Sequence, residues 1–225
     1  MTTALCRPVT RLLDLALPPV CAGCRREGDA ICRACLPSVG SRVDLPAGTP
    51  LGLAEGPPHP LLQLEWCSPF AGTTRRALHA LKYDGERRLA RPLGEVVAAR
   101  WRRAGAGGEV LVNVPVHVGR GRERGYDQAA LIAREAADAL QLPWTNALDR
   151  TRATTAQFRL DRRHRAANVH EAFAVRPEAR ARIANRWVVL VDDVVTTGAT
   201  LCEAARALLD AGAGAVSAVC VARER

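Results

Sequence analysis

The feature that most constrains this chain is one run of residues, Val188-Val-Leu-Val-Asp-Asp-Val-Val-Thr-Thr-Gly-Ala-Thr200. Its uninterrupted apolar start, Trp187 to Val191, is typical of a strand that is buried on both faces of a parallel sheet. Two aspartates and a turn of small residues follow, and a helix is predicted from Thr200 to Asp210. Because ligands bind beyond the carboxyl ends of strands in open parallel sheets, the run predicts an α/β fold with a ligand site at this strand end.

The rest of the chain alternates between strands and helices, which indicates a mainly parallel sheet flanked by helices. Further helices are predicted at Thr73–Tyr83, Glu86–Arg103 and Gln128–Leu140. Further strands are predicted at Glu109–Val116, Ala147–Arg152 and Val216–Val221. The polar, arginine-rich segment Thr154–Val169 is expected to be a mobile loop with a helical turn.

The residues after the strand at Trp187–Val191 suit a sugar phosphate. The turn leads directly into a helix, whose first backbone N–H groups lack intrahelical partners and can surround a phosphate. Gly198 lets the backbone approach the phosphate oxygens closely. The carboxylates of Asp192 and Asp193 can each accept a hydrogen bond from one of two vicinal ribose hydroxyls. Hydroxyl donors are supplied by Thr196, Thr197 and Thr200.

Two other interpretations of the aspartates compete with this one. A Walker B strand of an ATPase also ends in acidic residues, but it requires a G-x-x-x-x-G-K-[ST] loop. The single lysine of the chain, Lys82, stands in Ala-Leu-Lys-Tyr instead, which argues against Walker-type ATP hydrolysis. The plainer alternative, two aspartates that only cap a helix, stays open.

Four of the eight cysteines form two CxxC pairs, Cys21-Ala-Gly-Cys24 and Cys32-Arg-Ala-Cys35. Two such turns supply four soft ligands at tetrahedral geometry, as in structural zinc sites. A disulfide pair and four unrelated thiols are the alternatives. We favour zinc, because disulfides are rare in the reducing compartment in which we expect this protein.

No segment is expected to insert into a membrane. The most apolar early stretch, Leu12–Val20, is short and broken by Asp14 and two prolines, and it lacks a signal-peptide cleavage site. We therefore expect a cytoplasmic protein. Its predicted parts are a helix (Leu5–Leu17) with a zinc module over residues 1–45, a Pro/Gly-rich linker over 46–60, and a main domain over 61–225.

The formal charge of +9 and the pI near 9.7 favour nucleic acid or ligands with several phosphates. Almost all of this charge is arginine, so codon bias is an alternative source. The loop at 119–125 carries Arg120, Arg122 and Arg124, whose guanidinium groups suit phosphate oxygens, although a solvated basic turn is the plainer interpretation. Lys82 is expected to face a phosphate or DNA, or to stabilise the end of its helix as a cation.

Together these segments resemble a known family. The run Val188–Thr200 is similar to the motif of type I phosphoribosyltransferases that binds 5-phosphoribosyl 1-pyrophosphate (PRPP), and the whole chain resembles the ComF family of that fold, which is associated with competence and DNA uptake. The two CxxC pairs contribute to the resemblance. So do Leu81-Lys-Tyr-Asp-Gly85, Val114-Pro-Val, Arg124-Gly-Tyr-Asp-Gln128 and Arg152-x4-Gln157-x2-Leu160-x4-Arg165-x2-Asn168-x4-Phe173. In one departure, Asp127 stands where the family usually has Asn, which adds a negative charge near the arginine loop.

The resemblance implies a role for each part of the motif. Asp192 and Asp193 would hold the ribose hydroxyls of PRPP, and Arg152–Asn168 would form a closing flap. The 5′-phosphate would be held by Thr196, Thr197, Gly198, Ala199 and Thr200. The pyrophosphate, with Mg²⁺, would meet Arg120, Arg122, Arg124 and Gly125, with Lys82 nearby.

Single-stranded DNA and other DNA-uptake proteins are the partners that this resemblance implies. Because a fold does not fix a reaction, three functions stay open. The chain is a phosphoribosyltransferase with an acceptor that the sequence does not identify, a DNA-handling protein of the uptake machinery, or a PRPP-responsive regulator.

Overall fold

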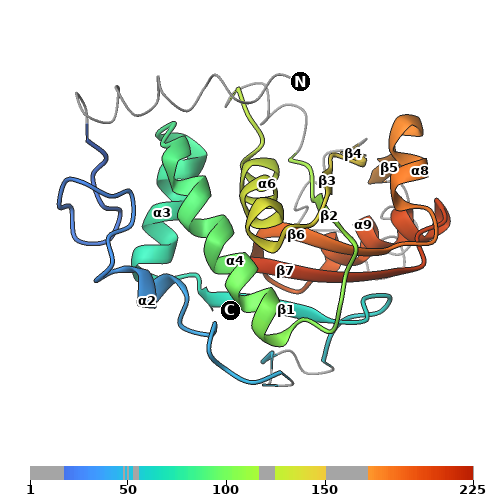
Figure 1. Ribbon diagram of the computed structural model, residues 1–225, viewed down its shortest axis with the longest axis horizontal. Helices are drawn as coiled ribbons and strands as arrows, with labels where there is room; N and C mark the ends of the chain where they lie inside the picture. The colour runs from blue at the N-terminus through green and yellow to red at the C-terminus, as the bar shows by residue number, and fades with distance from the viewer. Residues whose placement is uncertain are drawn as a thin grey trace, which may run out of the picture.

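The computed structural model describes residues 18–47, 49, 51–52, 56–116, 125–150 and 172–224. Within them, one five-stranded sheet has the strand order β1-β7-β6-β2-β3, with every pair parallel (Figure 1). Its strands are β1 (Leu64–Pro69), β2 (Val110–Asn113), β3 (Trp144–Thr145), β6 (Trp187–Val195) and β7 (Ala215–Arg223). A separate antiparallel pair consists of β4 (Leu148–Arg150) and β5 (Phe173–Val175). The predicted mainly parallel sheet is confirmed.

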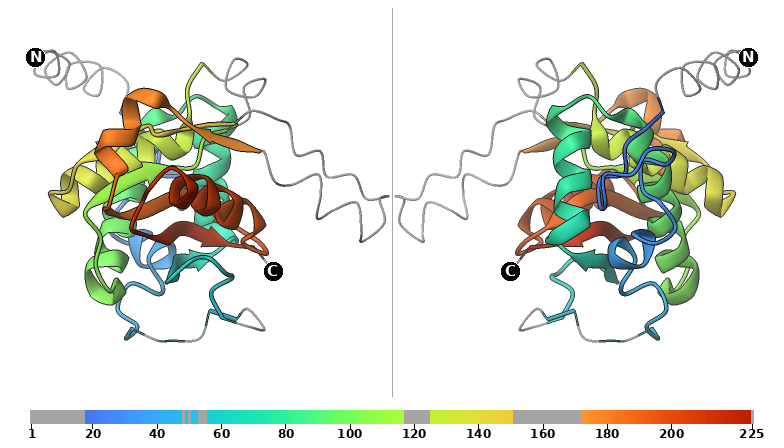
Figure 2. Two further views of the ribbon diagram at one scale, coloured as in Figure 1. Left: turned by 90° about the vertical axis from the view of Figure 1, so that its right-hand side faces the viewer. Right: turned by 90° about the vertical axis from the view of Figure 1, so that its left-hand side faces the viewer.

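The main helices cover the two faces of the sheet (Figures 1 and 2). Those on one face are α3 (Gly72–Tyr83), α4 (Ala90–Ala104) and α6 (Gln128–Leu140), and α9 (Ala199–Asp210) covers the other. Shorter helical segments are α2 (Leu36–Val39), η1 (Arg87–Leu89), η2 (Pro177–Ala179) and α8 (Arg180–Ile183). Alternate residues of each strand serve the two faces, so the strands are largely apolar on both, with a few buried polar residues such as Glu65 and Ser217.

The order in which the chain adds strands to the sheet reverses between the neighbouring parallel strands β2 and β6. From β2 the chain passes through α6 to β3 at one edge of the sheet, whereas from β6 it passes through α9 to β7 on the other side. The connections therefore diverge at the switch point between the carboxyl ends of β2 and β6, a region that we term the crevice. Such a switch point is where open parallel sheets bind ligands.

The strand that carries the aspartates is longer than the sequence predicted. β6 pairs with β2 only as far as Val191, which lies opposite Asn113. It then continues to Val195 alongside β7. The predicted strand end at Val191 is wrong, because β7 supplies backbone partners after β2 has stopped. β2 itself stops early, since Pro115 has no N–H to donate.

The other predicted elements agree in type. The helix Gln128–Leu140 is found as predicted, and the helix expected from Glu86 begins at Ala90 after the turn η1, where Glu86 accepts the N–H of Arg88 at 3.3 Å. The strands β1, β3 and β5 were not predicted. The predicted helix Leu5–Leu17 and the loop Thr154–Val169 lie outside the described residues. No described helix combines the length and apolar character needed to cross a membrane.

The segment with the CxxC pairs packs on the main sheet domain beside α3 (Figure 2). Its Ala30, Ile31 and Val39 belong to the same buried cluster as the apolar side chains of α3 and α4. The fully buried Arg100 of α4 pairs with Glu65 of β1 at 2.6 Å. The same guanidinium donates to the carbonyl oxygens of Arg42 and Leu45, at 2.7 and 2.6 Å. Residues on both sides of the boundary expected at 45 therefore share one core.

Candidate functional site

The crevice between β2 and β6 contains both predicted aspartates, on opposite faces of the sheet. Along β6, Val189 and Val191 pack under α4 and α6, whereas Val188 and Leu190 pack under α9. Since this alternation has a period of two, Asp193 lies on the α6 side and Asp192 on the α9 side. The pair therefore presents two carboxyls in different surroundings.

Asp193 is the more enclosed of the two, with 6% of its surface exposed. Its Oδ2 atom accepts a hydrogen bond from Gln128 Nε2 at 2.8 Å and an ion pair from Lys82 Nζ, also at 2.8 Å. Lys82 comes from the last turn of α3 and Gln128 from the first turn of α6. The carboxylate is thus held by two helices that approach from the same face.

Asp192 is half-buried, and its Oδ1 atom accepts the backbone N–H of Asp193 at 2.7 Å. Burial and the neighbouring charge of Asp193 raise the pKa of Asp192 well above its usual value, although this N–H and Lys82 oppose the rise. A carboxylate in such surroundings is stabilised by any partner that donates hydrogen bonds to it. Ribose hydroxyls are donors of that kind.

The turn from Thr196 to Thr200 leads from β6 into α9. Gly198, the N-cap of α9, has φ +83°, which glycine adopts readily and other residues rarely do. A Cβ atom added there would lie 2.8 Å from Cγ of Pro58, so the turn also passes close to the preceding segment. Thr196, Thr197 and Ala199 are exposed and Thr200 is half-buried. The first turn of α9 therefore faces solvent with threonine side chains around it.

The β2 side of the crevice is built around Asp127, the residue that departs from the family pattern. As N-cap of α6, its Oδ1 atom accepts the N–H of Ala130 at 3.0 Å. Its Oδ2 atom accepts the N–H of Val116 at 3.1 Å, and Asn113 Nδ2 lies 3.5 Å from the same oxygen. Burial raises the pKa of Asp127, while these N–H donors lower it. The additional negative charge thus holds the start of α6 and the end of β2 together.

The segments around Leu81 and Tyr126, which are distant in the sequence, contact each other next to the β2 side of the crevice. The hydroxyl of Tyr126 donates to the carbonyl oxygen of Leu81, and the Arg87 guanidinium lies 4.4 Å from the centroid of the Tyr126 ring. Gly125 has φ +70°, again in the region that glycine favours. The arginines predicted to contact pyrophosphate, Arg120, Arg122 and Arg124, lie outside the described residues, as does the predicted flap Arg152–Asn168.

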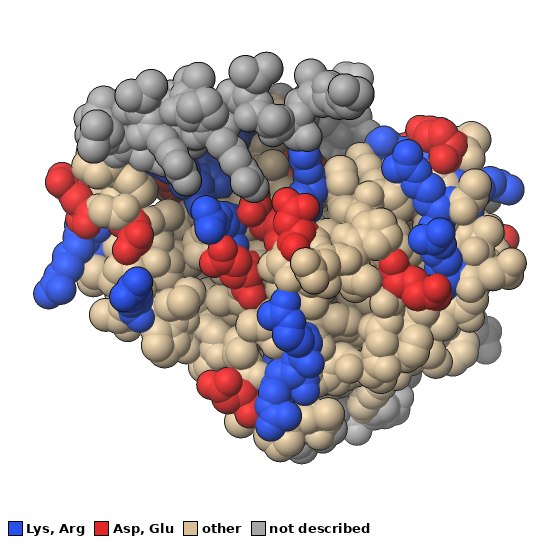
Figure 3. Space-filling view, in the orientation of Figure 1, with Lys and Arg blue, Asp and Glu red and all other residues tan. Residues whose placement is uncertain are grey.

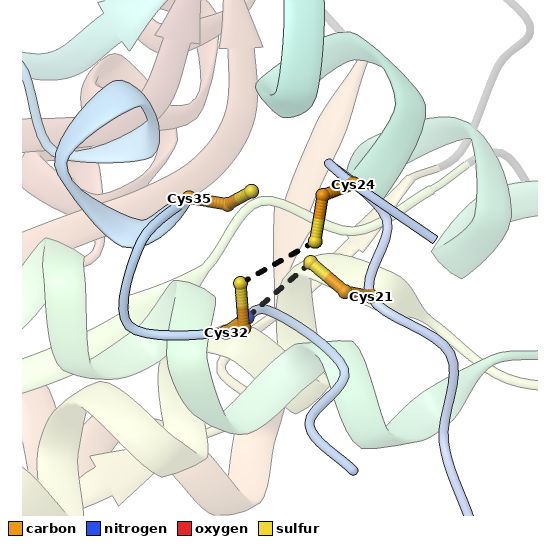
Figure 4. A group of neighbouring side chains, drawn as sticks. All are labelled: Cys21, Cys24, Cys32 and Cys35. Atoms are coloured by element: carbon orange, nitrogen blue, oxygen red, sulfur yellow. Dashed lines mark hydrogen bonds between the residues drawn. The ribbon is translucent and has the colours of Figure 1, made fainter. Parts of the chain in front are cut away.

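The second candidate site is the cysteine cluster, whose Sγ atoms all lie within 4.8 Å of one another (Figure 4). The Sγ atoms of Cys24 and Cys32 lie 3.6 Å apart, and all four cysteines are free thiols. Gly23 makes this approach possible, because a Cβ atom there would lie 2.5 Å from Cys35 Sγ. The cluster can hold a metal ion such as zinc, which prefers four thiolates in tetrahedral geometry.

The surroundings of Cys21 suit a metal-binding thiolate. Its Sγ atom accepts the N–H groups of Gly23 and Cys32 at 3.3 Å each. Burial raises the pKa of this thiol, but the backbone donors outweigh it and lower the pKa to about 6. Burial and the three neighbouring sulfurs raise the pKa of Cys35 to about 12. A cation at the centre removes the repulsion among the four sulfurs.

Comparison with known proteins agrees with this architecture. The family model of the phosphoribosyl transferase domain matches residues 127–225. The DNA utilization protein YhgH of Escherichia coli K12 is 31% identical over 226 residues, which cover 97% of this chain and 95% of the relative. The protein of the same name from Salmonella typhi is 31% identical over 228 residues, with the same coverage.

A further relative matches only part of the chain. Competence protein F of Haemophilus influenzae is 34% identical over 105 residues, which are 46% of this chain and 45% of that protein. Three findings agree with the family pattern. They are the 31% identity to the YhgH proteins over nearly the whole chain, the phosphoribosyl transferase domain and the four-cysteine cluster. The chain belongs to the ComF family.

Proposed function

We propose that this chain binds PRPP, or a closely related ribose 5-phosphate, in the crevice between β2 and β6. The observation that carries the proposal is the placement of Asp192, Asp193 and the N-terminus of α9 together at the switch point of the sheet. The helix start attracts a phosphate through its unpaired N–H groups and its dipole. The carboxyls supply the acceptors that ribose hydroxyls need.

In the proposed complex, the 5′-phosphate lies against residues Thr196 to Thr200 and the ribose lies over the aspartates. The pyrophosphate meets the loop that contains Gly125 and the three arginines. Mg²⁺ would neutralise charge on the pyrophosphate, and Asp192 suits a neighbouring cation because its carboxyl is costly to ionise alone. Cleavage at C1 of the ribose would then be favoured by the negative field of the two carboxyls on an oxocarbenium-like state.

The biological setting is part of the proposal and comes from the relatives. Their names refer to DNA utilization and competence, so we propose a cytoplasmic role linked to DNA uptake. Zinc at the cysteine cluster belongs to the same proposal. A transferase, a PRPP-responsive regulator and a DNA-handling protein all remain compatible with the ribose 5-phosphate site.

Direct binding of single-stranded DNA is the alternative that the net charge favours. On the face shown in Figure 3, however, basic side chains stand in separate groups that alternate with acidic ones. A groove that follows a phosphate backbone usually has a more continuous basic lining. Its test is the dependence of affinity on salt, because contacts dominated by phosphates weaken steeply as salt rises. An affinity that does not change with salt would exclude this mode of binding.

The primary test is calorimetric titration of the protein with PRPP and Mg²⁺. We expect saturable binding by the wild type and an affinity about tenfold lower in Asp192→Asn, since hydrogen bonds to charged groups contribute about 1.5–3 kcal/mol. Asp138→Asn is the matched control, because Asp138 is exposed on α6 and the charge change is the same. An equal affinity in both variants would exclude Asp192 from the site. A screen for pyrophosphate release with different acceptors then separates a transferase from a regulator.

A further inference from the structure

Lys82 is the single lysine of the chain, and it is already engaged inside the crevice. Its Nζ atom and Gln128 Nε2 both contact the same atom, Oδ2 of Asp193, at 2.8 Å. The side chains of the ion pair are only 19% and 9% exposed. Since both donors use Oδ2, the other oxygen, Oδ1, is the acceptor that a ribose hydroxyl would use.

The charges around Asp193 explain why this pair would persist when a ligand binds. Asp192 is the preceding residue of β6 and Asp127 lies at the start of α6. Both add negative charge near Asp193. Lys82 is the cation that the structure places in contact with this group of carboxylates. If Lys82 turned to a phosphate, Asp193 would stay behind as an enclosed carboxylate with no counter-charge among the residues that the structure describes. Leaving one member of an enclosed ion pair unpaired is strongly unfavourable.

The position of Lys82 is itself fixed from both ends of α3. Beside Lys82, the carbonyl oxygen of Leu81 accepts the hydroxyl of Tyr126. Near the other end, Arg76 Nε donates to the carbonyl oxygen of Ala22 at 2.8 Å, and Arg76 Nη2 donates to that of Gly23 at 3.1 Å. Gly23 belongs to the first CxxC turn. The helix thus connects the cysteine cluster with the aspartate.

We infer that Lys82 is a positioning residue, which holds the Asp193 carboxylate in place for the ribose hydroxyls and does not contact the phosphates of the ligand. The inference deepens the proposed function and rests on it. It replaces the role expected from the sequence, in which Lys82 faces a phosphate. It also gives α3 a function, because the helix sets where the Lys82 amine lies relative to β6.

A double-mutant cycle on ribose 5-phosphate affinity tests the inference. The variants are Lys82→Met, Asp193→Asn and the double variant, titrated up to millimolar ligand, with Arg75→Met as the control on an exposed position of the same helix. We expect Lys82→Met to weaken binding about tenfold in the wild-type background and less than about twofold in the Asp193→Asn background. Equal losses in both backgrounds would overturn the inference, because a phosphate contact does not depend on Asp193.

In a second cycle, the ligand is varied and Asp193 is left unchanged. If Lys82 acts through the carboxylate that accepts the hydroxyls, Lys82→Met lowers the affinity for ribose 5-phosphate. It then hardly changes the affinity for 2,3-dideoxyribose 5-phosphate, which lacks both hydroxyls. A lysine that contacts phosphate weakens both ligands equally, and this result would overturn the inference while the proposed function stands. Failure of the folded wild type to bind either ribose 5-phosphate or PRPP with Mg²⁺ would overturn the proposed function and this inference with it.

Discussion

The cysteine cluster and the ribose crevice are built in opposite ways. The four thiols come from one short segment, Cys21 to Cys35, and backbone turns bring them together. The crevice takes Lys82, Gln128 and Asp193 from two helices and a strand that are far apart in the sequence. A local site depends mainly on its own ligands and its ion, whereas an assembled site depends on every contact that holds its elements in place. α3 contacts both sites and therefore makes the difference testable.

The largest effect is expected at the local site. In Cys21→Ser, one of four thiolates is lost, and metal analysis should show that the ion is lost with it. We expect a melting temperature lower by more than about 15 °C, since the binding free energy of a structural metal is folding free energy. Cys202→Ala is the control, because Cys202 lies outside the cluster. Full metal content in Cys21→Ser would show that the cluster does not act as a single four-ligand site.

The next effect concerns Arg100 of α4, which pairs with Glu65 of β1 and donates to the segment that follows the cysteine cluster. Arg100→Met leaves Glu65 enclosed without its partner and removes the donors to Arg42 and Leu45. Breaking a buried pair in this way costs about 3–5 kcal/mol, which urea unfolding can measure. Arg103→Met, at an exposed position of α4, should change the free energy of unfolding by less than about 0.5 kcal/mol. Similar values for the two variants would contradict the structural role of Arg100.

The same contrast explains what the sequence could predict. The CxxC spacing and the run Val188–Thr200 are local patterns, so the cluster, the parallel sheet and the crevice edge were predictable from them. The partners of Asp193 were not, because a contact between Lys82 and a residue more than a hundred positions away has no periodic signal. β1 was missed for a related reason. Its buried Glu65 looks like a solvent-facing residue until Arg100 is placed beside it.

A smaller effect is expected at the phosphate turn. Gly198→Ala places a Cβ atom on a residue with φ +83°, 2.8 Å from Pro58, and we expect a loss of about 1–2 kcal/mol in stability. Affinity for ribose 5-phosphate should fall as well. Gly212→Ala has a similar φ of +97° without close neighbours, so it isolates the backbone cost from the contact with Pro58. If Gly198→Ala binds the ligand as well as the wild type and Gly212→Ala do, the turn is not a phosphate site.

The raised pKa of Asp192 predicts a stability cost that depends on pH. Since the folded protein binds this proton more tightly than the unfolded chain, the free energy of unfolding falls as pH rises from the ordinary aspartate pKa of 3.8 through the raised pKa. Asp192→Asn lacks this fall, so at pH 8 we expect it to be more stable than the wild type, with little difference below pH 4. Parallel stability profiles for the two proteins would contradict the unfavourable setting of Asp192.

The smallest effect tests the connection through α3. Arg76→Ala removes the donors to Ala22 and Gly23 without touching the crevice. We expect affinity for ribose 5-phosphate to fall about twofold to threefold, which is about 0.4–0.7 kcal/mol. Arg75→Ala, one position earlier on the same helix, should bind as the wild type does. An unchanged affinity in Arg76→Ala would mean that the two sites are independent.

One measurement tests the location of the ligand most directly. Because the chain has a single lysine, selective ¹³C labelling of lysine gives one side-chain signal in the NMR spectrum, and that signal reports on the crevice. We predict that ribose 5-phosphate shifts it in a saturable way and that ribose without the phosphate has little effect. A Lys82 signal that does not move at saturating ribose 5-phosphate would contradict a ligand site between β2 and β6.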